Sequence, residues 1–151
     1  MPAPRPDRLP VTLLTGFLGS GKTTLLNRLL RHPGFERTAV ILNEFGDVGL
    51  DHELVVATSE TMVLLHSGCV CCTVRGDLID ALDEIGGAGD ACRLEGVVTT
   101  VDACAGLATL DRQPEACAQA ALADRLLVTK DDLADPADVA ALEERLRRLN
   151  P

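Results

Sequence analysis

The sequence of 151 residues predicts an α/β protein with three layers, built on a mainly parallel sheet. Two observations lead to this prediction. Near the N-terminus, a glycine-rich phosphate-binding motif joins an apolar run to a helical pattern. Farther along, short apolar runs alternate with segments of helical periodicity, which is typical of parallel strands joined by helices. Together these features indicate a P-loop NTPase fold.

The phosphate-binding motif lies within residues 11–24, VTLLTGFLGSGKTT. The run 11–15 reads as a buried strand, residues 16–23 fit G-x-x-x-x-G-K-[ST], and a helix with an apolar face follows at once. Glycines let the backbone N–H groups converge on a phosphate at the positive end of that helix. An ordinary helix opened by a glycine-rich turn is the alternative, but the flanking strand and helix favour nucleotide binding. The expected nucleotide-binding residues here are Gly16, Gly19, Ser20, Gly21, Lys22, Thr23 and Thr24.

Two residues of the motif are expected to act in catalysis. Lys22 would reach the β- and γ-phosphates, and the Thr23 hydroxyl would ligate Mg²⁺.

The amino-acid composition disfavours several classes of function. The chain has 23 acidic against 14 basic residues and no Trp or Tyr, which disfavours a nucleic-acid partner. Residues 1–9 form a proline-rich lead-in without the apolar core of a signal peptide, and no apolar run reaches the roughly 20 residues that span a bilayer. We therefore expect a cytoplasmic protein with no membrane partner. In that setting six cysteines favour metal or redox chemistry over disulfides.

The first half of the chain predicts two more strands. The helix after the motif should end near residues 32–34, and residues 38–43 form a β-branched run suited to a parallel strand. The loop 44–52 follows it with two glycines and several acids, where open α/β sheets place their ligands, although a solvated turn explains the acids equally well. A third apolar run spans residues 61–65.

Three thiols within four residues follow this third run, at Cys69, Cys71 and Cys72. Thiolates suit Zn²⁺ or Cu(I), and His66 or Glu44 would complete a tetrahedral set. Cysteines also occur as small core residues, but three in a cluster favour a metal site. The other cysteines, Cys92, Cys104 and Cys117, are expected in the core.

The second half predicts a helix over 75–85, a flexible break at 86–90 and a strand over 96–102. Because that strand ends in Asp102, this carboxylate is a candidate Walker B acid at the magnesium. A helix is expected over 114–123, a strand over 124–128, and a last helix capped by residues 135–136.

Residues 129–132, TKDD, fit the guanine-reading pattern [NT]-K-x-D. Asp132 would accept two hydrogen bonds from guanine that adenine does not supply, and Lys130 would lie along the base. Thr129 stands where Asn is more common. A helix-capping segment is the alternative reading, but the position after a buried strand favours GTP over ATP.

Taken together, the segments GFLGSGKTT, NEFGDVGLD, SGCVCCTVRGDL, GVVTTVDA and TKDDL resemble the CobW-type GTPases, the metal-chaperone branch that includes the CobW, HypB and UreG proteins. The resemblance runs from residue 10 to residue 151. It implies GTP and Mg²⁺ at the motif, guanine read by Thr129, Lys130 and Asp132, and slow GTP hydrolysis. It also implies Zn²⁺ held by the three clustered cysteines and delivered to a client metalloprotein.

The same resemblance makes Glu44 and Asp47 candidates for linking that metal to Mg²⁺ and the γ-phosphate.

Two departures from the family pattern shape the expectations. Between residues 85 and 94 the chain lacks a strand ending in an E-T-[ST]-G-L-A-D-P-like segment, which supplies the family's Walker B acid. Hydrolysis should then be slow or absent unless Asp102 takes that role. The sheet should be thinner, and self-association into a homo-oligomer would compensate for the lost stability. Residues 10–151 would therefore be an incomplete GTPase domain, with no C-terminal domain after it.

Three functions follow from these patterns. The first is a GTP-dependent zinc-handling protein, and the second is a nucleotide- and metal-binding module with little hydrolysis. The third is a small-molecule kinase, which the cysteine cluster and the guanine-reading pattern disfavour.

Overall fold

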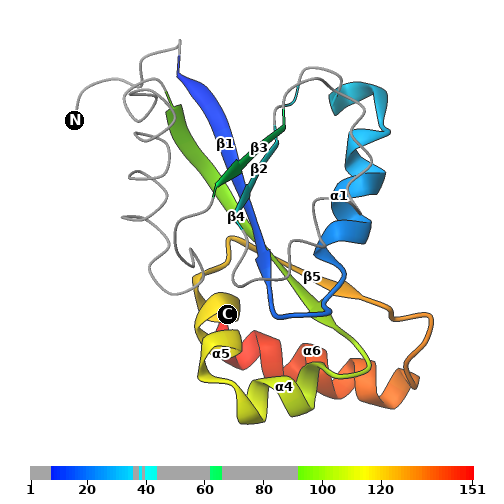
Figure 1. The fold of residues 1–151 in the computed structure, drawn as a ribbon. Helices are drawn as coiled ribbons and strands as arrows, with labels where there is room; N and C mark the ends of the chain where they lie inside the picture. The colour runs from blue at the N-terminus through cyan, green and yellow to red at the C-terminus, as the bar shows by residue number, and fades with distance from the viewer. Residues whose placement is uncertain (1–7, 36–37, 39, 44–61, 66–91) are drawn as a thin grey trace.

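The computed structural model describes residues 8–35, 38, 40–43, 62–65 and 92–151 (Figure 1). The predicted loop 44–52, the clustered cysteines and the predicted helix 75–85 lie outside these residues. Within the described part, no helix is both long and apolar enough to cross a membrane.

The phosphate-binding motif lies between a strand and a helix, as predicted. Strand β1 spans Leu9–Gly16 and helix α1 spans Lys22–Leu30, followed by a short 3-10 turn, η1, over Pro33–Phe35. Gly21 caps α1 in the left-handed conformation, with φ of 89°, which a residue without a Cβ adopts at little cost. The chain therefore turns from strand to helix within five residues.

The central sheet has three parallel strands in the order β1–β4–β5. Strand β4 spans Cys92–Asp102 and begins four residues before its predicted start, and β5 spans Arg125–Thr129. In register, Gly16 of β1 faces Thr100, and Asp102 faces Thr129. The carboxyl ends of all three strands thus meet at one edge, which is where open parallel sheets bind ligands.

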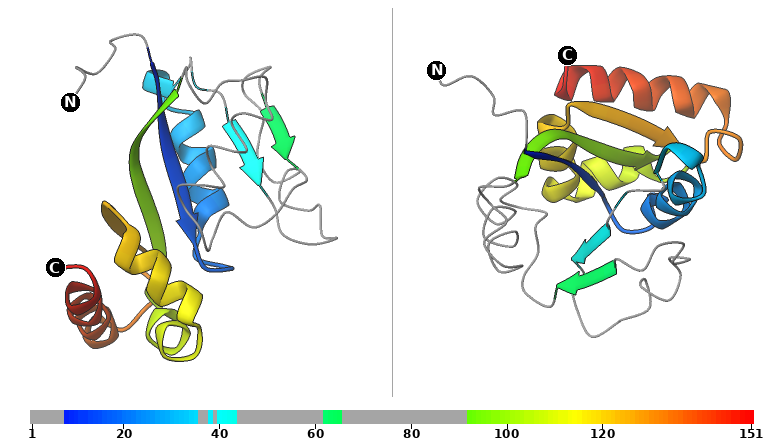
Figure 2. Two further views of the ribbon diagram at one scale, coloured as in Figure 1. Left: turned by 90° about the vertical axis from the view of Figure 1, so that its left-hand side faces the viewer. Right: turned by 90° about the horizontal axis from the view of Figure 1, so that it is seen from above.

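Two further strands form a separate sheet. Strands β2, Val40–Asn43, and β3, Met62–Leu65, pair in parallel with each other. Both views in Figure 2 place them beyond β1, on the side away from β4. The described strands are therefore divided into two sheets, and β1 has one described strand partner, β4. Among the described strands, the central sheet therefore contains three, and all of them are parallel, as the predicted fold class requires.

Three helices complete the described part: α4 over Gly106–Arg112, α5 over Pro114–Leu122 and α6 over Pro136–Leu149. Asp135 caps α6 as predicted, since its side chain accepts a hydrogen bond from the Ala137 N–H at 2.8 Å. Helix α4 was not predicted. Its capping residue, Ala105, has no side-chain acceptor, and the carboxylate of Asp102 accepts from the Cys104 and Ala105 N–H groups instead.

The core lies between these helices and the sheet. Its buried members come from β4, α4, α5 and α6, namely Val101, Leu110, Ala116, Ala120, Leu142 and Leu146. In Figures 1 and 2, α1 lies on the other side of the sheet, so helices cover both faces. Cys104 is exposed, which corrects the prediction that it belongs to the core, because it lies in the turn between β4 and α4.

Candidate functional site

Left-handed backbone at three glycines shapes the phosphate-binding loop. Gly16, Gly19 and Gly21 have φ values of 146°, 76° and 89°. Residues with a Cβ rarely adopt such values, so the glycine spacing in the sequence reflects a backbone requirement. The loop curls at the amino end of α1, where helix N–H groups favour a bound anion.

The loop also approaches β4 closely at Gly16. A Cβ built on this glycine would overlap the Thr100 hydroxyl and lie 2.6 Å from both the Thr100 carbonyl oxygen and the Ser20 hydroxyl. Ser20 is only 3% exposed, and its hydroxyl shares a hydrogen bond of 2.6 Å with that of Thr100. The loop is thus held against the middle strand by two buried hydroxyls.

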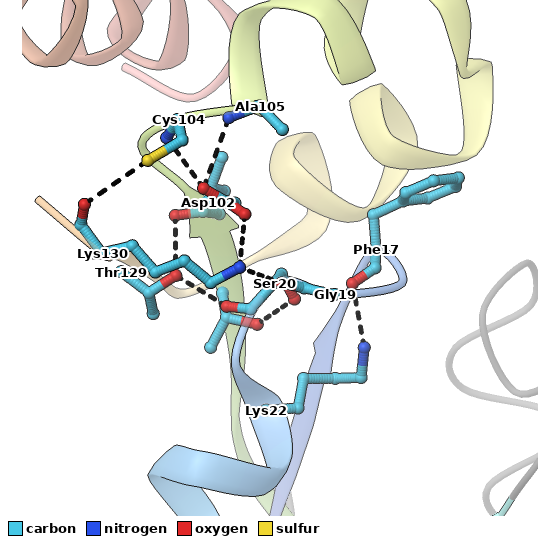
Figure 3. Close-up of polar contacts among 11 residues, drawn as sticks. Phe17, Gly19, Ser20, Lys22, Asp102, Cys104, Ala105, Thr129 and Lys130 are labelled. Carbon is cyan, nitrogen blue, oxygen red and sulfur yellow. Dashed lines mark hydrogen bonds and ion pairs between the residues drawn. The ribbon is translucent and has the colours of Figure 1, made fainter. Parts of the chain in front are cut away.

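Lys22 points back across the loop. Its Nζ donates to the carbonyl oxygens of Gly16 at 2.7 Å and Phe17 at 3.0 Å, as Figure 3 illustrates for Phe17. These bonds hold a positive charge close to the curled backbone. A phosphate bound in the loop would therefore meet an ammonium group that is already oriented.

The end of β5 holds the same loop from the other side. Thr129 Oγ1 donates to the Ser20 carbonyl oxygen at 2.6 Å, and Lys130 Nζ donates to the Gly19 carbonyl oxygen at 2.7 Å. Lys130 has a φ of 58°, in the left-handed region that is uncommon for a residue with a side chain. The segment predicted to read the base and the segment predicted to hold the phosphates are therefore joined directly (Figure 3).

Asp102, the candidate Walker B acid, forms an ion pair with Lys130. Its Oδ2 accepts from Lys130 Nζ at 2.7 Å, while its Oδ1 accepts from the backbone N–H groups of Cys104 at 2.8 Å and Ala105 at 3.3 Å. Partial burial would raise the pKa of this carboxyl, but these hydrogen bonds and the lysine charge outweigh it and hold the pKa below its ordinary value of 3.8. The carboxylate is ionised and committed to the lysine, so a role at magnesium would require that ion pair to open.

The remaining predicted site residues divide into two groups. Thr23 lies in the first turn of α1 and Asp132 is exposed in the turn that follows β5, both at the carboxyl edge of the sheet. The predicted metal residues Glu44, Cys69, Cys71 and Cys72 lie outside the described residues. Among the described residues, no group of three or more His, Cys, Asp or Glu side chains is placed to hold a metal.

Sequence reasoning missed the role of Thr100. Its hydroxyl bonds to Ser20 and to the Thr15 carbonyl oxygen at 3.2 Å, which ties β4 to both ends of the loop. A signal was present, because two adjacent threonines interrupt the apolar run of β4 and Thr99 and Thr100 are both almost fully buried. Buried hydroxyls require partners.

Comparison with known proteins identifies the family to which this architecture corresponds. A family model described as the CobW/HypB/UreG nucleotide-binding domain matches residues 10–90 and 86–151. The zinc chaperone YjiA of Escherichia coli is 36% identical over an alignment of 176 positions, which covers 94% of this chain and 55% of that protein. The zinc-regulated GTPase metalloprotein activator 1 of Schizosaccharomyces pombe is 46% identical over 85 residues, which cover 52% of this chain and 21% of that protein. The chain thus spans about half of the length of YjiA and less of the other relative.

Solved structures of YjiA agree with the fold. The crystal structure of the Zn(II)-bound YjiA GTPase from E. coli superposes with a TM-score of 0.63 at 29% identity, covering 95% of this chain and 55% of that one. A second structure, of a YjiA variant in which one glutamate and two cysteines are changed to alanine, is also Zn(II)-bound and superposes with a TM-score of 0.61.

The close approach at Gly16 gives a first prediction. The Gly16→Ala substitution should lower the free energy of unfolding by about 2 kcal/mol or more, since the new Cβ overlaps β4 in a backbone region unsuited to alanine. Gly19→Ala is the matched control, because a Cβ there meets nothing within 4 Å and costs only about 1 kcal/mol of backbone strain. Urea denaturation measures both. Equal losses in the two variants would contradict the close approach.

The ion pair at Asp102 gives a second prediction, for the Asp102→Asn variant at pH 7. Its free energy of unfolding should fall by about 1 to 2 kcal/mol, because Lys130 loses its charged acceptor. The folded-state pKa of Asp102 is depressed, so its stabilising effect is present above the unfolded-state value and is lost as the pH falls through the folded-state value. The difference from wild type should therefore shrink in acid.

The matched control for this prediction is Asp111→Asn. Asp111 is 69% exposed and lies 3.9 Å from Arg145, so its loss should change stability by less than about 0.5 kcal/mol. Urea denaturation at pH 7 and pH 3 measures all three proteins. A deficit of Asp102→Asn that stays constant over this range would contradict the assigned ion pair.

Proposed function

The chain belongs to the CobW/HypB/UreG family of nucleotide-binding proteins, and from that premise we propose that it is a GTP-binding, zinc-handling protein of the metallochaperone type. In this proposal GTP binds at the carboxyl edge of the β1–β4–β5 sheet, and Zn²⁺ is the cargo delivered to a client metalloprotein. GTP and Zn²⁺ are thus its ligands, and Mg²⁺ accompanies the nucleotide.

The observation that carries the proposal is the direct joining of the two nucleotide-reading segments. Thr129 and Lys130 donate to the carbonyl oxygens of Ser20 and Gly19. A nucleotide whose phosphates lie on the loop at residues 16–24 would extend its base toward the end of β5. Asp132, exposed there, has the acceptor oxygens that guanine N1–H and its 2-amino group require. This arrangement supports GTP over ATP.

Zinc handling rests on the sequence and on the relatives. The relatives are named as a zinc chaperone and a zinc-regulated GTPase metalloprotein activator, and the CxCC cluster at residues 69–72 supplies soft thiolate donors. In the proposal Cys69, Cys71 and Cys72 hold the zinc with Glu44 as a further ligand. Among the described residues, no group of three or more His, Cys, Asp or Glu side chains offers an alternative metal site.

The second candidate, nucleotide binding with little turnover, is favoured by the state of Asp102. Mg²⁺ usually binds one or two carboxylates together with phosphate oxygens, and when bound it would neutralise charge on the β- and γ-phosphates. Of the described residues, Thr23 fits this role by its place in the first turn of α1, whereas the Asp102 carboxylate is already paired with Lys130. We therefore expect binding to be tight and hydrolysis to be slow.

Base selection gives a third prediction. The Asp132→Ala variant should bind GTP about 10- to 100-fold more weakly while its affinity for ATP stays nearly constant, because charged hydrogen bonds to guanine are lost. Asp131→Ala is the matched control and should change the GTP affinity by less than about twofold, since the neighbouring carboxylate is also exposed but occupies the unspecified position x of the [NT]-K-x-D pattern. Competition of GTP and ATP against a fluorescent GTP analogue gives these affinities. Tighter binding of ATP than GTP by wild type would revive the kinase function.

Coupling between nucleotide and metal gives a fourth prediction. The affinity for GTP with Mg²⁺ should change in the presence of Zn²⁺, and the affinity for Zn²⁺ should change by the same factor with GTP, because linkage is reciprocal. The coupling should disappear in the double variant Cys71→Ser, Cys72→Ser and persist in Cys104→Ser, which changes an exposed thiol outside the cluster.

The zinc titration needs the coupling as its readout, because binding alone does not identify the site. A YjiA variant without one glutamate and two cysteines still has zinc bound in its crystal. Zinc that binds without altering the GTP affinity would therefore contradict the zinc-handling proposal. Phosphate release on the same samples, with Lys22→Ala as the inactive control, separates the slow GTPase from the binding module.

A further inference from the structure

A pocket lies on the α4 and α5 side of the sheet, directly behind the phosphate-binding loop. The empty space in the pocket, together with the open solvent at its mouth, amounts to about 380 Å³. Phe17, Leu18 and Ser20 of the loop form one wall, and β4, α4 and α5 form the rest. The proposed nucleotide would lie on the backbone of the same loop, so a ligand in the pocket would contact the loop from behind.

The pocket contains a buried acceptor without a partner. Gln119 of α5 lines it, is 4% exposed, and none of the described residues hydrogen-bonds to its side-chain oxygen. The position of α5 is fixed, because Thr99 Oγ1 donates to the Gln119 backbone oxygen at 3.0 Å. Buried polar atoms are nearly always paired, so this oxygen points to a ligand with an N–H or O–H donor.

The strand next to this pocket is incompletely covered. Of the β1 side chains, Leu13 and Leu14 are only half-buried and Leu9 is 65% exposed, although a strand of this apolar character is usually enclosed in a parallel sheet. On the side away from β4, no described strand pairs with β1. Among the described strands, this edge of β1 is therefore the place where one more strand would pair.

The comparison with YjiA gives the length of the segment that YjiA has and this chain does not. The alignment covers 94% of the 151 residues, about 142, yet spans 176 positions, so about 34 positions face no residue of this chain. The family model matches in two segments that meet at residues 86–90, just before β4. About 34 residues ahead of a parallel strand is the length of one β–α unit.

Topology places that unit beside the pocket. A strand added between β1 and the β2–β3 sheet would have to cross over β1 to reach β4. This crossover would run across the sheet in the same direction as the crossover from β4 to β5. Right-handed crossovers that run in the same direction lie on the same face. The added helix would therefore lie on the α4 and α5 side, over β1 and next to Gln119.

We propose that the edge of β1 with which no described strand pairs, together with the pocket at Gln119, forms an acceptor site for a β–α segment supplied by another polypeptide. The segment pairs in parallel with β1, covers the half-buried Leu13 on the α4 and α5 face of that strand, and presents a hydrogen-bond donor to the Gln119 oxygen. Because Phe17 and Leu18 line the site, binding of the segment also restrains the phosphate-binding loop. This inference goes beyond the proposed function, which requires only the chain itself to bind GTP and zinc.

The test uses the full chain and a defined probe, a fluorescein-labelled peptide with the stretch of E. coli YjiA that falls in the alignment gap. The peptide should bind saturably in fluorescence anisotropy and raise the unfolding temperature, whereas a scrambled peptide should do neither. Gln119→Leu removes the acceptor at similar volume, and it should lower the peptide affinity about tenfold while the free variant unfolds at the same or a higher temperature. Gln113→Leu is the matched control, because Gln113 does not line the pocket and the peptide should bind this variant as wild type.

Two outcomes would overturn the proposal. One is peptide binding no stronger than that of the scrambled sequence. The other is equal peptide affinity in Gln119→Leu and wild type, which would show that the buried oxygen accepts no hydrogen bond from the peptide. GTP binding is measured on the same samples without peptide, and its absence would contradict the proposed function rather than the acceptor site.

Discussion

The structure depends on the side chain of Lys130, which joins the Gly19 carbonyl oxygen to the carboxylate of Asp102. Through this one ammonium the end of β5 is tied both to the phosphate-binding loop and to the end of β4. Thr129 adds a second bond, to the Ser20 carbonyl oxygen. The carboxyl edge of the sheet is therefore held together as one unit, in which the segment predicted to select the base is bonded directly to the loop predicted to hold the phosphates.

The ion pair between Lys130 and Asp102 also explains why the site is poorly suited to rapid hydrolysis. Phosphoryl transfer depends on charge placed around magnesium and the attacking water. One carboxylate oxygen of Asp102 pairs with Lys130, and the other accepts a hydrogen bond from the turn before α4. Asp102 therefore fixes the positions of these neighbouring segments. The two segments matched by the family model meet at residues 86–90, just before β4, which is where the family pattern places its Walker B acid. Binding of nucleotide and zinc is thus better supported than rapid hydrolysis.

The sequence predicted the features that depend on neighbours along the chain. The β1–α1 unit follows from glycine spacing, and α6 follows from the Asp135 cap and its apolar stripe. Helix α4 was missed because no capping side chain directly precedes it, and the N–H groups of Cys104 and Ala105 in the turn before it bind instead to Asp102 at the end of β4. Asp102 was interpreted as a Walker B acid at the magnesium because no pattern along the chain reveals Lys130 as its partner. The division of the strands into two sheets was likewise not predictable from the sequence, because it depends on contacts between segments far apart along the chain.

Amide hydrogen exchange of the nucleotide-free protein tests most directly whether Lys130 holds the phosphate-binding loop. Lys130→Met keeps the apolar stem and removes the donor to Gly19 and Asp102. The account predicts that amides of residues 17–21 exchange about tenfold faster than in wild type, as expected for the loss of a charged hydrogen bond, while amides of α6 are unchanged. Equal exchange of the loop amides in the two proteins would contradict it.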